Sequence, residues 1–170
     1  VDKGFDIVAP IPSCVLMFKQ ELPLMFPEDK EIENIKNAFF DPFEYLVLRH
    51  KAGLIKTDFQ ESLGTVAYHA ACHQRVQNIG AKTKEFISLI PETEIISIER
   101  CSGHDGTYAL KEETYDKAMK IARPVVNQVK KVNADTFGSD CPMAGRMIAH
   151  GKGTNDAEHP ISMVRRAYGI

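Results

Sequence analysis

The sequence predicts an α/β fold in which a parallel sheet is flanked by helices. After Gly64, short apolar runs typical of strands alternate with longer segments whose apolar residues follow a helical period. Strands that alternate with helices imply parallel pairing with right-handed crossovers. The chain has 170 residues, of which 44% are hydrophobic, so it also has enough apolar material for a core.

The elements of residues 64–170 follow this alternation. Three short apolar runs bounded by polar residues or glycine are the predicted strands: Thr65–His69, Glu94–Ile98 and Thr136–Ser139. The predicted helices have amphipathic spacing or capping signals, although the first of them could equally be a turn: Cys72–Ile79, Lys82–Ile90, Glu112–Val132, Cys141–Ala149 and Pro160–Tyr168. We expect a kink at Pro124 and a flexible loop at Gly151–Gly153.

Residues 1–58 have a different pattern, and we expect a boundary within the polar, irregular stretch Leu54–Leu63. The apolar run Asp6–Pro10 predicts a buried strand that leaves its sheet at the proline. Helical patterns follow at Val15–Met25, Glu28–Asn37 and Asp41–Gly53. In the last of these, Asp41 is a suitable cap, because a proline follows it directly and a glutamate stands three residues later.

Composition and charge exclude several classes of protein. The 21 basic and 23 acidic residues give a net charge of −2, which argues against nucleic-acid binding as the main function. No apolar run reaches the roughly 20 residues that a transmembrane helix needs. No signal peptide is visible either, so we expect a cytoplasmic protein. The four cysteines include no Cys-x-x-Cys pair, so their spacing alone predicts neither a zinc finger nor a thioredoxin motif.

Each cysteine follows a predicted strand: Cys14, Cys72, Cys101 and Cys141. The carboxyl ends of parallel strands lie at one edge of a sheet, where ligand sites form, so we expect the last three to converge there. Cys141 also begins a predicted helix, whose dipole favours an anionic ligand. The alternative is buried apolar thiols, since free cysteine is often buried. The polar and glycine neighbours of these three cysteines favour metal or redox chemistry.

Histidines and glycines near these cysteines could complete a site. His73 could be a ligand or could donate a hydrogen bond to a cluster sulfur. His104 is a candidate ligand or proton donor, with a surface-loop histidine as the alternative, and His69 is equally compatible with a ligand and with a satisfied histidine at a strand end. Gly103 and Gly106 permit positive φ angles, so amides of their turn could point at a thiolate or sulfide.

Taken in order, three stretches resemble the cysteine-rich CCG domain: Tyr68-His69-x-x-Cys72-His73, Glu99-Arg100-Cys101-Ser102-Gly103-His104-Asp105-Gly106 and Ser139-Asp140-Cys141-Pro142. This domain occurs in the B subunit of heterodisulfide reductase, in the C subunit of anaerobic glycerol-3-phosphate dehydrogenase and in the iron–sulfur subunit of glycolate oxidase, usually twice per chain. The resemblance implies that residues 64–170 are one complete cysteine-rich repeat and that residues 1–58 are the tail of a preceding one. Cys14 would then be a metal ligand in that preceding repeat, and the chain would be the trailing portion of a longer protein.

The sequence departs from the family pattern at three positions. Ser102 replaces the second adjacent cysteine, and Ala144 and Met17 stand where the Cys-x-x-Cys pairs would end. Three cysteines cannot supply the five thiolates of a non-cubane cluster. They could hold a [4Fe-4S] cluster with His73 or His104 as the fourth ligand, or a zinc ion with three thiolates and one imidazole.

The resemblance therefore implies an iron–sulfur electron-transfer module of an oxidoreductase, with Cys72, Cys101 and Cys141 as ligands. Its electrons would come from a partner flavoprotein or a ferredoxin-like segment, and any membrane association would be peripheral, through a partner subunit. The second hypothesis is a zinc-stabilised or metal-free interaction module without redox activity. The third is thiol–disulfide chemistry with Cys101 as nucleophile, which is the weakest because no resolving cysteine is near it in sequence.

Overall fold

The computed structural model describes residues 1–170, and the chain forms two compact units. The sheet unit comprises residues 57–72 and 87–170, and the N-terminal unit comprises residues 1–56 and 73–86. Cys72, Cys101 and Cys141 belong to the sheet unit, whereas Cys14 and His73 belong to the N-terminal unit. No helix combines the length and the apolar character that crossing a membrane would require.

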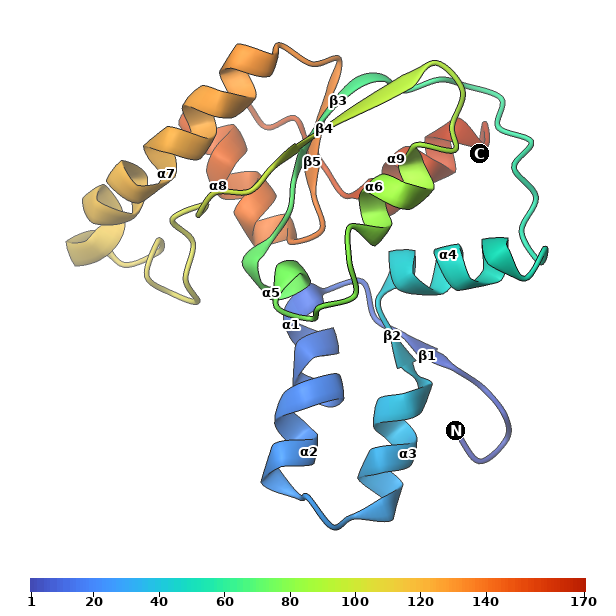
Figure 1. Cartoon of the computed structure of the whole chain (residues 1–170). Coiled ribbons are helices and arrows are strands. Elements are labelled where there is room, and N and C mark those ends of the chain that lie inside the picture. Colours follow the sequence, from blue (N-terminus) through green and yellow to red (C-terminus); the bar gives the residue numbers. More distant parts are fainter. The chain divides into compact units, whose positions relative to one another are not determined.

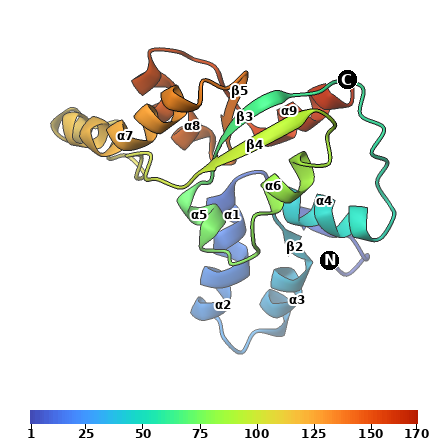
Figure 2. The same cartoon turned by 45° about the horizontal axis from the view of Figure 1, so that its top comes forward.

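The sheet unit is built on four parallel strands in the order β4-β3-β5-β6. Their bounds are β3 (Gly64–His69), β4 (Thr93–Ile98), β5 (Thr136–Ser139) and β6 (Ala157–Glu158). Strand β3 lies between β4 and β5 (Figures 1 and 2), and its last residue, His69, pairs with Ile98 on one side and Ser139 on the other. The predicted α/β class with a parallel sheet flanked by helices is confirmed.

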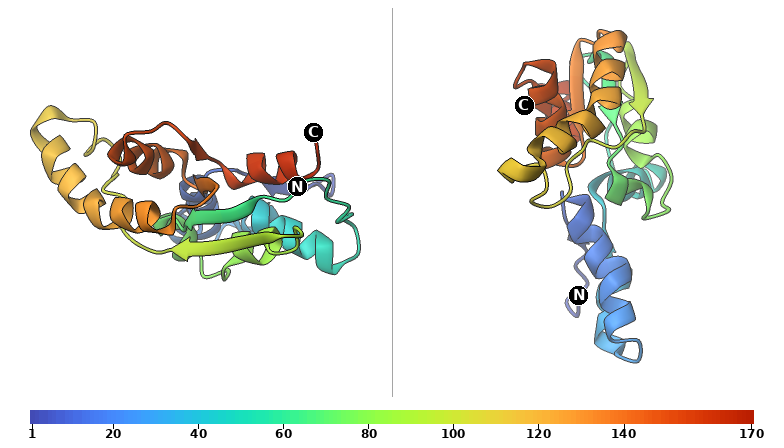
Figure 3. Two further views of the ribbon diagram at one scale, coloured as in Figure 1. Left: turned by 90° about the horizontal axis from the view of Figure 1, so that it is seen from above. Right: turned by 90° about the vertical axis from the view of Figure 1, so that its left-hand side faces the viewer.

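Helices α7 (Glu112–Val132) and α8 (Pro142–Lys152) pack against each other and share a buried core with one face of this sheet (Figure 3). The core contains Phe137 of β5. Because successive residues of a strand point to opposite faces, Gly138 faces the other side. There a Cβ on Gly138 would lie 2.3 Å from Cε of Met163, which belongs to α9 (Pro160–Ala167). Helices therefore cover both faces of the sheet.

The N-terminal unit holds a two-stranded parallel pair and a set of helices. The strands are β1 (Ile7–Val8) and β2 (Phe39–Phe40). The helices are α1 (Pro12–Leu16), a π-helical turn (Met17–Glu21), α2 (Leu22–Met25), α3 (Lys30–Ala38) and α4 (Pro42–Lys51). The segment after β3 adds α5 (Cys72–Arg75) and α6 (Lys82–Ile87). The predicted cap of α4 is present, because Asp41 Oδ1 accepts hydrogen bonds from the Phe43 and Glu44 amides.

Two local expectations were wrong, and two short strands were not expected at all. The strand β1 exists, but Ile7 and Val8 are exposed, so the Asp6–Pro10 run is not a buried strand. Residues 151 and 152 do not belong to a loop, because α8 continues to Lys152 and ends at Gly153, whose φ of +84° closes the helix. The two-residue strands β2 and β6 were not expected, since so short a strand is defined by its distant partner rather than by a local pattern.

Candidate functional site

Three cysteines lie at the carboxyl edge of the sheet. Cys72 follows β3, Cys101 follows β4 and Cys141 follows β5, and these three strands are adjacent and parallel. Cys72 and Cys101 are exposed, Cys141 is partly exposed, and none of them forms a disulfide. The alternative interpretation, in which these cysteines are apolar thiols buried in the core, therefore does not apply. The sheet topology therefore brings three reactive sulfur atoms to one edge, each on a different strand end.

The turn after β4 directs a backbone amide at one of these sulfur atoms. The Gly103 N–H donates to Sγ of Cys101 at 3.4 Å. Gly103 has a φ of +74°, and a Cβ there would lie 2.3 Å from the Ala118 carbonyl oxygen of α7. Only glycine fits this position, because the turn packs directly on the backbone of α7. Gly106 also has a positive φ of +51°, but nothing lies within 4 Å of the place where its Cβ would be.

The third cysteine is held at the start of a helix. Cys141 is the N-cap residue of α8, with Pro142 in the first helical turn. Its carbonyl oxygen accepts from the Gly145 amide at 2.9 Å, and its own amide donates to Ser139 Oγ at 3.3 Å. The backbone of Cys141 is thus fixed on both sides, while its thiol remains partly accessible.

His69 joins the ends of three adjacent strands, β4, β3 and β5. It is 1% exposed, and its Nε2 lies 2.8 Å from the Arg100 carbonyl oxygen while its Nδ1 lies 2.9 Å from Ser139 Oγ. A carbonyl oxygen can only accept, so Nε2 carries the proton, and in the neutral ring Nδ1 accepts from the Ser139 hydroxyl. Both ring nitrogens are therefore used. Of the two interpretations left open by the sequence, the satisfied strand-end histidine is the one that the structure contains.

A second buried set of polar groups lies beside it. The Tyr68 hydroxyl donates to Oδ2 of Asp140, and Nε2 of His159 donates to the Asp140 carbonyl oxygen at 3.1 Å. The proton is on Nε2 of His159 because its Nδ1 accepts from the Ile161 amide. Tyr68 and Asp140 are 3% and 2% exposed, so these bonds form away from water. Sequence reasoning did not find these roles, although Tyr68 and Asp140 directly precede His69 and Cys141.

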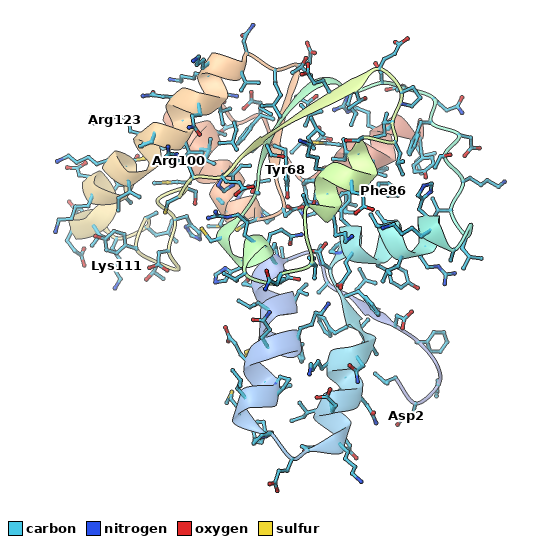
Figure 4. The ribbon with its side chains drawn as sticks, in the orientation of Figure 1. Asp2, Tyr68, Phe86, Arg100, Lys111 and Arg123 are labelled. Carbon is cyan, nitrogen blue, oxygen red and sulfur yellow. The ribbon has the colours of Figure 1, made fainter.

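Figure 4 labels Tyr68 on β3 and Arg100 just after β4. In the two networks, the side chains of Tyr68, His69, Ser139 and Asp140 satisfy one another or the backbone by hydrogen bonds. These residues stand at the ends of β3 and β5, just before the segments that carry Cys72 and Cys141. Since Arg100 immediately precedes Cys101, the bond from His69 to its carbonyl oxygen also fixes where the cysteine-bearing loop begins.

The other candidate residues are less closely gathered. His73 follows Cys72 in α5 and is exposed, and His104 is partly buried in the turn after β4. No three cysteine, histidine or acidic side chains stand close enough together to hold a metal ion between them. Cys14 is exposed on α1 of the N-terminal unit. The ligand roles of these three residues therefore stay predictions.

Two of the three positions that depart from the cysteine pattern, Ser102 and Ala144, are buried, and Met17 is partly exposed. Ser102 is 5% exposed, and its Oγ accepts from the His104 amide at 3.4 Å. Ala144 is 4% exposed on the inner side of α8. Neither side chain offers a metal ligand, so the donor set at this edge is limited to three thiols and the neighbouring imidazoles.

A comparison with known protein families finds a match that covers this edge of the sheet. Residues 66–148 match the family model described as CCG, cysteine-rich domain. We call these residues the CCG segment. It begins within β3 and ends within α8, so the CCG segment contains all three strand-end cysteines and both glycines of the turn. No curated protein matches the chain.

CCG domains are typically linked to iron–sulfur oxidoreductase subunits, and the chemistry of the donor set here is compatible with such a role. Thiolates are the usual ligands of iron–sulfur clusters and common ligands of zinc. A backbone amide already donates to one of the sulfur atoms, and such bonds are known to tune metal–thiolate centres. The thiols and imidazoles of the CCG segment therefore have the chemistry of metal or cluster ligands, and this chemistry suits iron–sulfur clusters and zinc alike.

Proposed function

We propose that the CCG segment binds an iron–sulfur cluster and serves as an electron-transfer module of an oxidoreductase. Cys72, Cys101 and Cys141 would hold the cluster, and His73 or His104 would supply the fourth ligand. The observation that carries this proposal is the position of three accessible thiols on the ends of three adjacent parallel strands. When bound, a [4Fe-4S] cluster supplies one-electron transfer between a reduced donor protein and an oxidised acceptor.

The chain's own residues would have separate tasks in this module. The Gly103 amide, which donates to Cys101 Sγ, would stabilise negative charge on that sulfur. The Gly103–Gly106 turn could present further amides to cluster sulfides. His69 and Ser139 would not ligate, but would keep the strand ends at fixed distances from one another. The proposed module resembles the B subunit of heterodisulfide reductase and the C subunit of glycerol-3-phosphate dehydrogenase, and its electrons would reach it from a flavoprotein or a ferredoxin-like segment.

The assignment of repeats belongs to the same proposal. Residues 64–170 would be one complete repeat, and residues 1–58 would be the end of a preceding one. In support, each of these regions has a parallel strand followed by a helix with proline in its first turn and a cysteine at or near its start. Cys14 would then serve a neighbouring site and not the site formed by the other three cysteines.

The test is anaerobic purification and reconstitution with iron and sulfide, followed by iron analysis, sulfide analysis and visible absorbance. We expect a brown protein, and we expect Cys72→Ser, Cys101→Ser and Cys141→Ser each to lower the iron bound per chain. Cys14→Ser is the matched control, because that cysteine is also exposed but lies in the other unit, and it should retain the iron. Equal loss of iron in Cys14→Ser would contradict the assignment of ligands.

A zinc-stabilised interaction module is the second candidate function. This candidate is favoured because Ser102 and Ala144 stand where the family pattern has cysteines, so only three thiols remain at this edge. Both replacing side chains are also buried. A zinc ion needs just four donors, so three thiolates and one imidazole would complete its shell. A colourless protein that binds about one zinc ion per chain, and no iron after reconstitution, would select this function over electron transfer.

A further inference from the structure

Helix α7 carries an exposed basic face that no ion pair within the chain neutralises. Residues 117–132 include five cations and no acid, although the whole chain has a net charge of −2. The cations are Lys117, Lys120, Arg123, Lys130 and Lys131, all exposed, and none takes part in a salt bridge or a side-chain hydrogen bond. The dipole of α7 explains Lys130 and Lys131, which lie in its last turn, but not the three cations in its middle.

Helical spacing places Lys117, Lys120 and Lys131 on one stripe, whereas Arg123 and Lys130 lie on the neighbouring flank of the helix. Lys117 and Ile121 are four residues apart, and Ile121 and Gln128 are seven residues apart, so these three lie along one side of the helix. Lys120 and Lys131 are about three helical turns apart and therefore also share a side. Ile121 is 47% exposed and lies at the edge of this stripe, whereas the apolar residues of the opposite side are buried in the core. An exposed isoleucine one helical turn from Lys117, at the margin of a basic stripe, can supply an apolar contact beside charged ones in a protein interface.

The stripe continues into a shallow groove beside the candidate site. This groove, of about 460 Å³, lies between the C-terminal end of α7 and β4, the outermost strand of the sheet. Ile96, Ile98 and Val132 supply its apolar lining, and its charged residues are the cations Arg100 and Lys131 and one acid, Glu99. Figure 4 shows Arg100 after β4 and Arg123 on α7. Since Arg100 directly precedes Cys101, a molecule bound in the groove would lie next to the loop that carries a proposed cluster ligand.

We propose that the α7 basic face and this groove are the docking surface for a small electron-carrier protein with an acidic surface. This inference rests on the proposed electron-transfer function. The acidic first part of α7, with Glu112, Glu113 and Asp116, disfavours a uniform polyanion such as DNA or an anionic membrane lying along the helix. A protein partner can match cations, acids and an exposed isoleucine together, and electrostatic steering would speed its encounter.

The test measures binding of an oxidised, acidic plant-type ferredoxin to the reconstituted protein and to the metal-free protein by calorimetry. The variant K117E/K120E/K131E reverses three charges of the basic face, and we expect it to weaken binding at least tenfold. The control K3E/K30E/K84E makes the same change in net charge at three exposed lysines of the N-terminal unit and should bind within about twofold of the wild type. Ile121→Ser should weaken binding several-fold without reducing its dependence on salt.

Two results would overturn the inference. One is no measurable binding of the ferredoxin, and the other is equal weakening by the two triple variants. Binding of phosphatidylserine vesicles or duplex DNA, without the ferredoxin, would also overturn it and would assign the basic face to a polyanion. Metal content is measured separately on the same samples. Docking by a chain that binds no cluster would therefore reject the proposed function and leave the docking surface standing, whereas a loaded chain that does not dock would reject only the docking surface.

Discussion

Replacing His69 is expected to loosen the edge of the sheet that carries the three thiols. The ring is 1% exposed and links the Arg100 carbonyl oxygen, at 2.8 Å, to Ser139 Oγ, at 2.9 Å. In His69→Ala, the buried Ser139 hydroxyl would lose the acceptor of its proton, the Arg100 carbonyl oxygen would lose its donor, and the volume of the imidazole would be left empty. The free energy of unfolding should therefore fall, and it should do so in the metal-free protein as well.

The size of this effect follows from the groups that lose a partner. A buried polar group left unsatisfied costs about 1–3 kcal/mol; the Ser139 hydroxyl becomes one such donor, and the emptied volume of the imidazole adds the cost of a cavity. Allowing for partial collapse of the cavity and for compensation by water, we expect His69→Ala to lower the free energy of unfolding by about 3–5 kcal/mol. His69→Gln keeps an amide donor for the Arg100 carbonyl oxygen and should cost about 1–2 kcal/mol. Both losses are large against a typical domain stability of about 5–15 kcal/mol.

The assay is urea unfolding of the metal-free protein followed by far-ultraviolet circular dichroism. The matched control is His73→Ala, because that histidine is exposed and should change stability by less than about 0.5 kcal/mol. A double-mutant cycle of His69→Ala with Ser139→Ala should give a coupling energy of about 0.5–3 kcal/mol. A loss below about 1 kcal/mol in His69→Ala, or a coupling energy of zero, would refute the bonding assigned to this histidine.

Three further outcomes are expected from urea unfolding. Tyr68→Phe should lose about 1–3 kcal/mol, because the buried Asp140 carboxyl would lose its hydroxyl donor, and a neutral result would contradict that bond. Gly103→Ala should lower the free energy of unfolding by more than about 3 kcal/mol, since its Cβ would collide with α7. The control Gly106→Ala, whose Cβ would meet open space, should lower it by about 1–2 kcal/mol. Equal losses in the two variants would argue against the packing of this turn on α7. Burial raises the pKa of the Asp41 carboxyl despite its bonds to the Phe43 and Glu44 amides, so stability should fall as the pH rises through that raised pKa. Asp41→Asn keeps the cap and should remove this fall, Asp41→Ala should lose about 1 kcal/mol, and an unchanged pH profile in Asp41→Asn would contradict the assignment.

The strands that position the site could be predicted because each has a strong local signal. Strands β3, β4 and β5 are apolar runs that end in polar residues, and their structural bounds agree closely with the predicted ones. Strands β2 and β6 have two residues each and are defined only by pairing with β1 and β5. No local pattern can specify such a pairing. The C-terminal end of α8 was misplaced for a similar reason, since Gly153 rather than Gly151 adopts the left-handed conformation.

The candidate site was predictable in its backbone placement but not in its polar support. A cysteine after each strand of a parallel sheet must lie at the same edge, so Cys72, Cys101 and Cys141 could be grouped from the sequence. The hydrogen bonds of His69 join residues 31 and 70 positions apart, and the Tyr68–Asp140 bond spans 72 positions. Which of many polar residues meet at such distances is decided by the register of the sheet, and the register was visible only in the structure.

The arrangement separates the support of the site from its ligands. Beneath the edge, His69 and Ser139 are buried and fully bonded, so the strand ends cannot shift without breaking hydrogen bonds. Above it, Cys72 is exposed at the start of α5, Cys101 is exposed in the loop after β4, and Gly106 faces open space. Gly103 anchors the start of its turn against α7, and His104 follows it directly in the sheet unit that also holds the three thiols, whereas His73 belongs to the N-terminal unit. If a metal binds at this edge, we therefore expect His104→Ala to lower its affinity more than His73→Ala does.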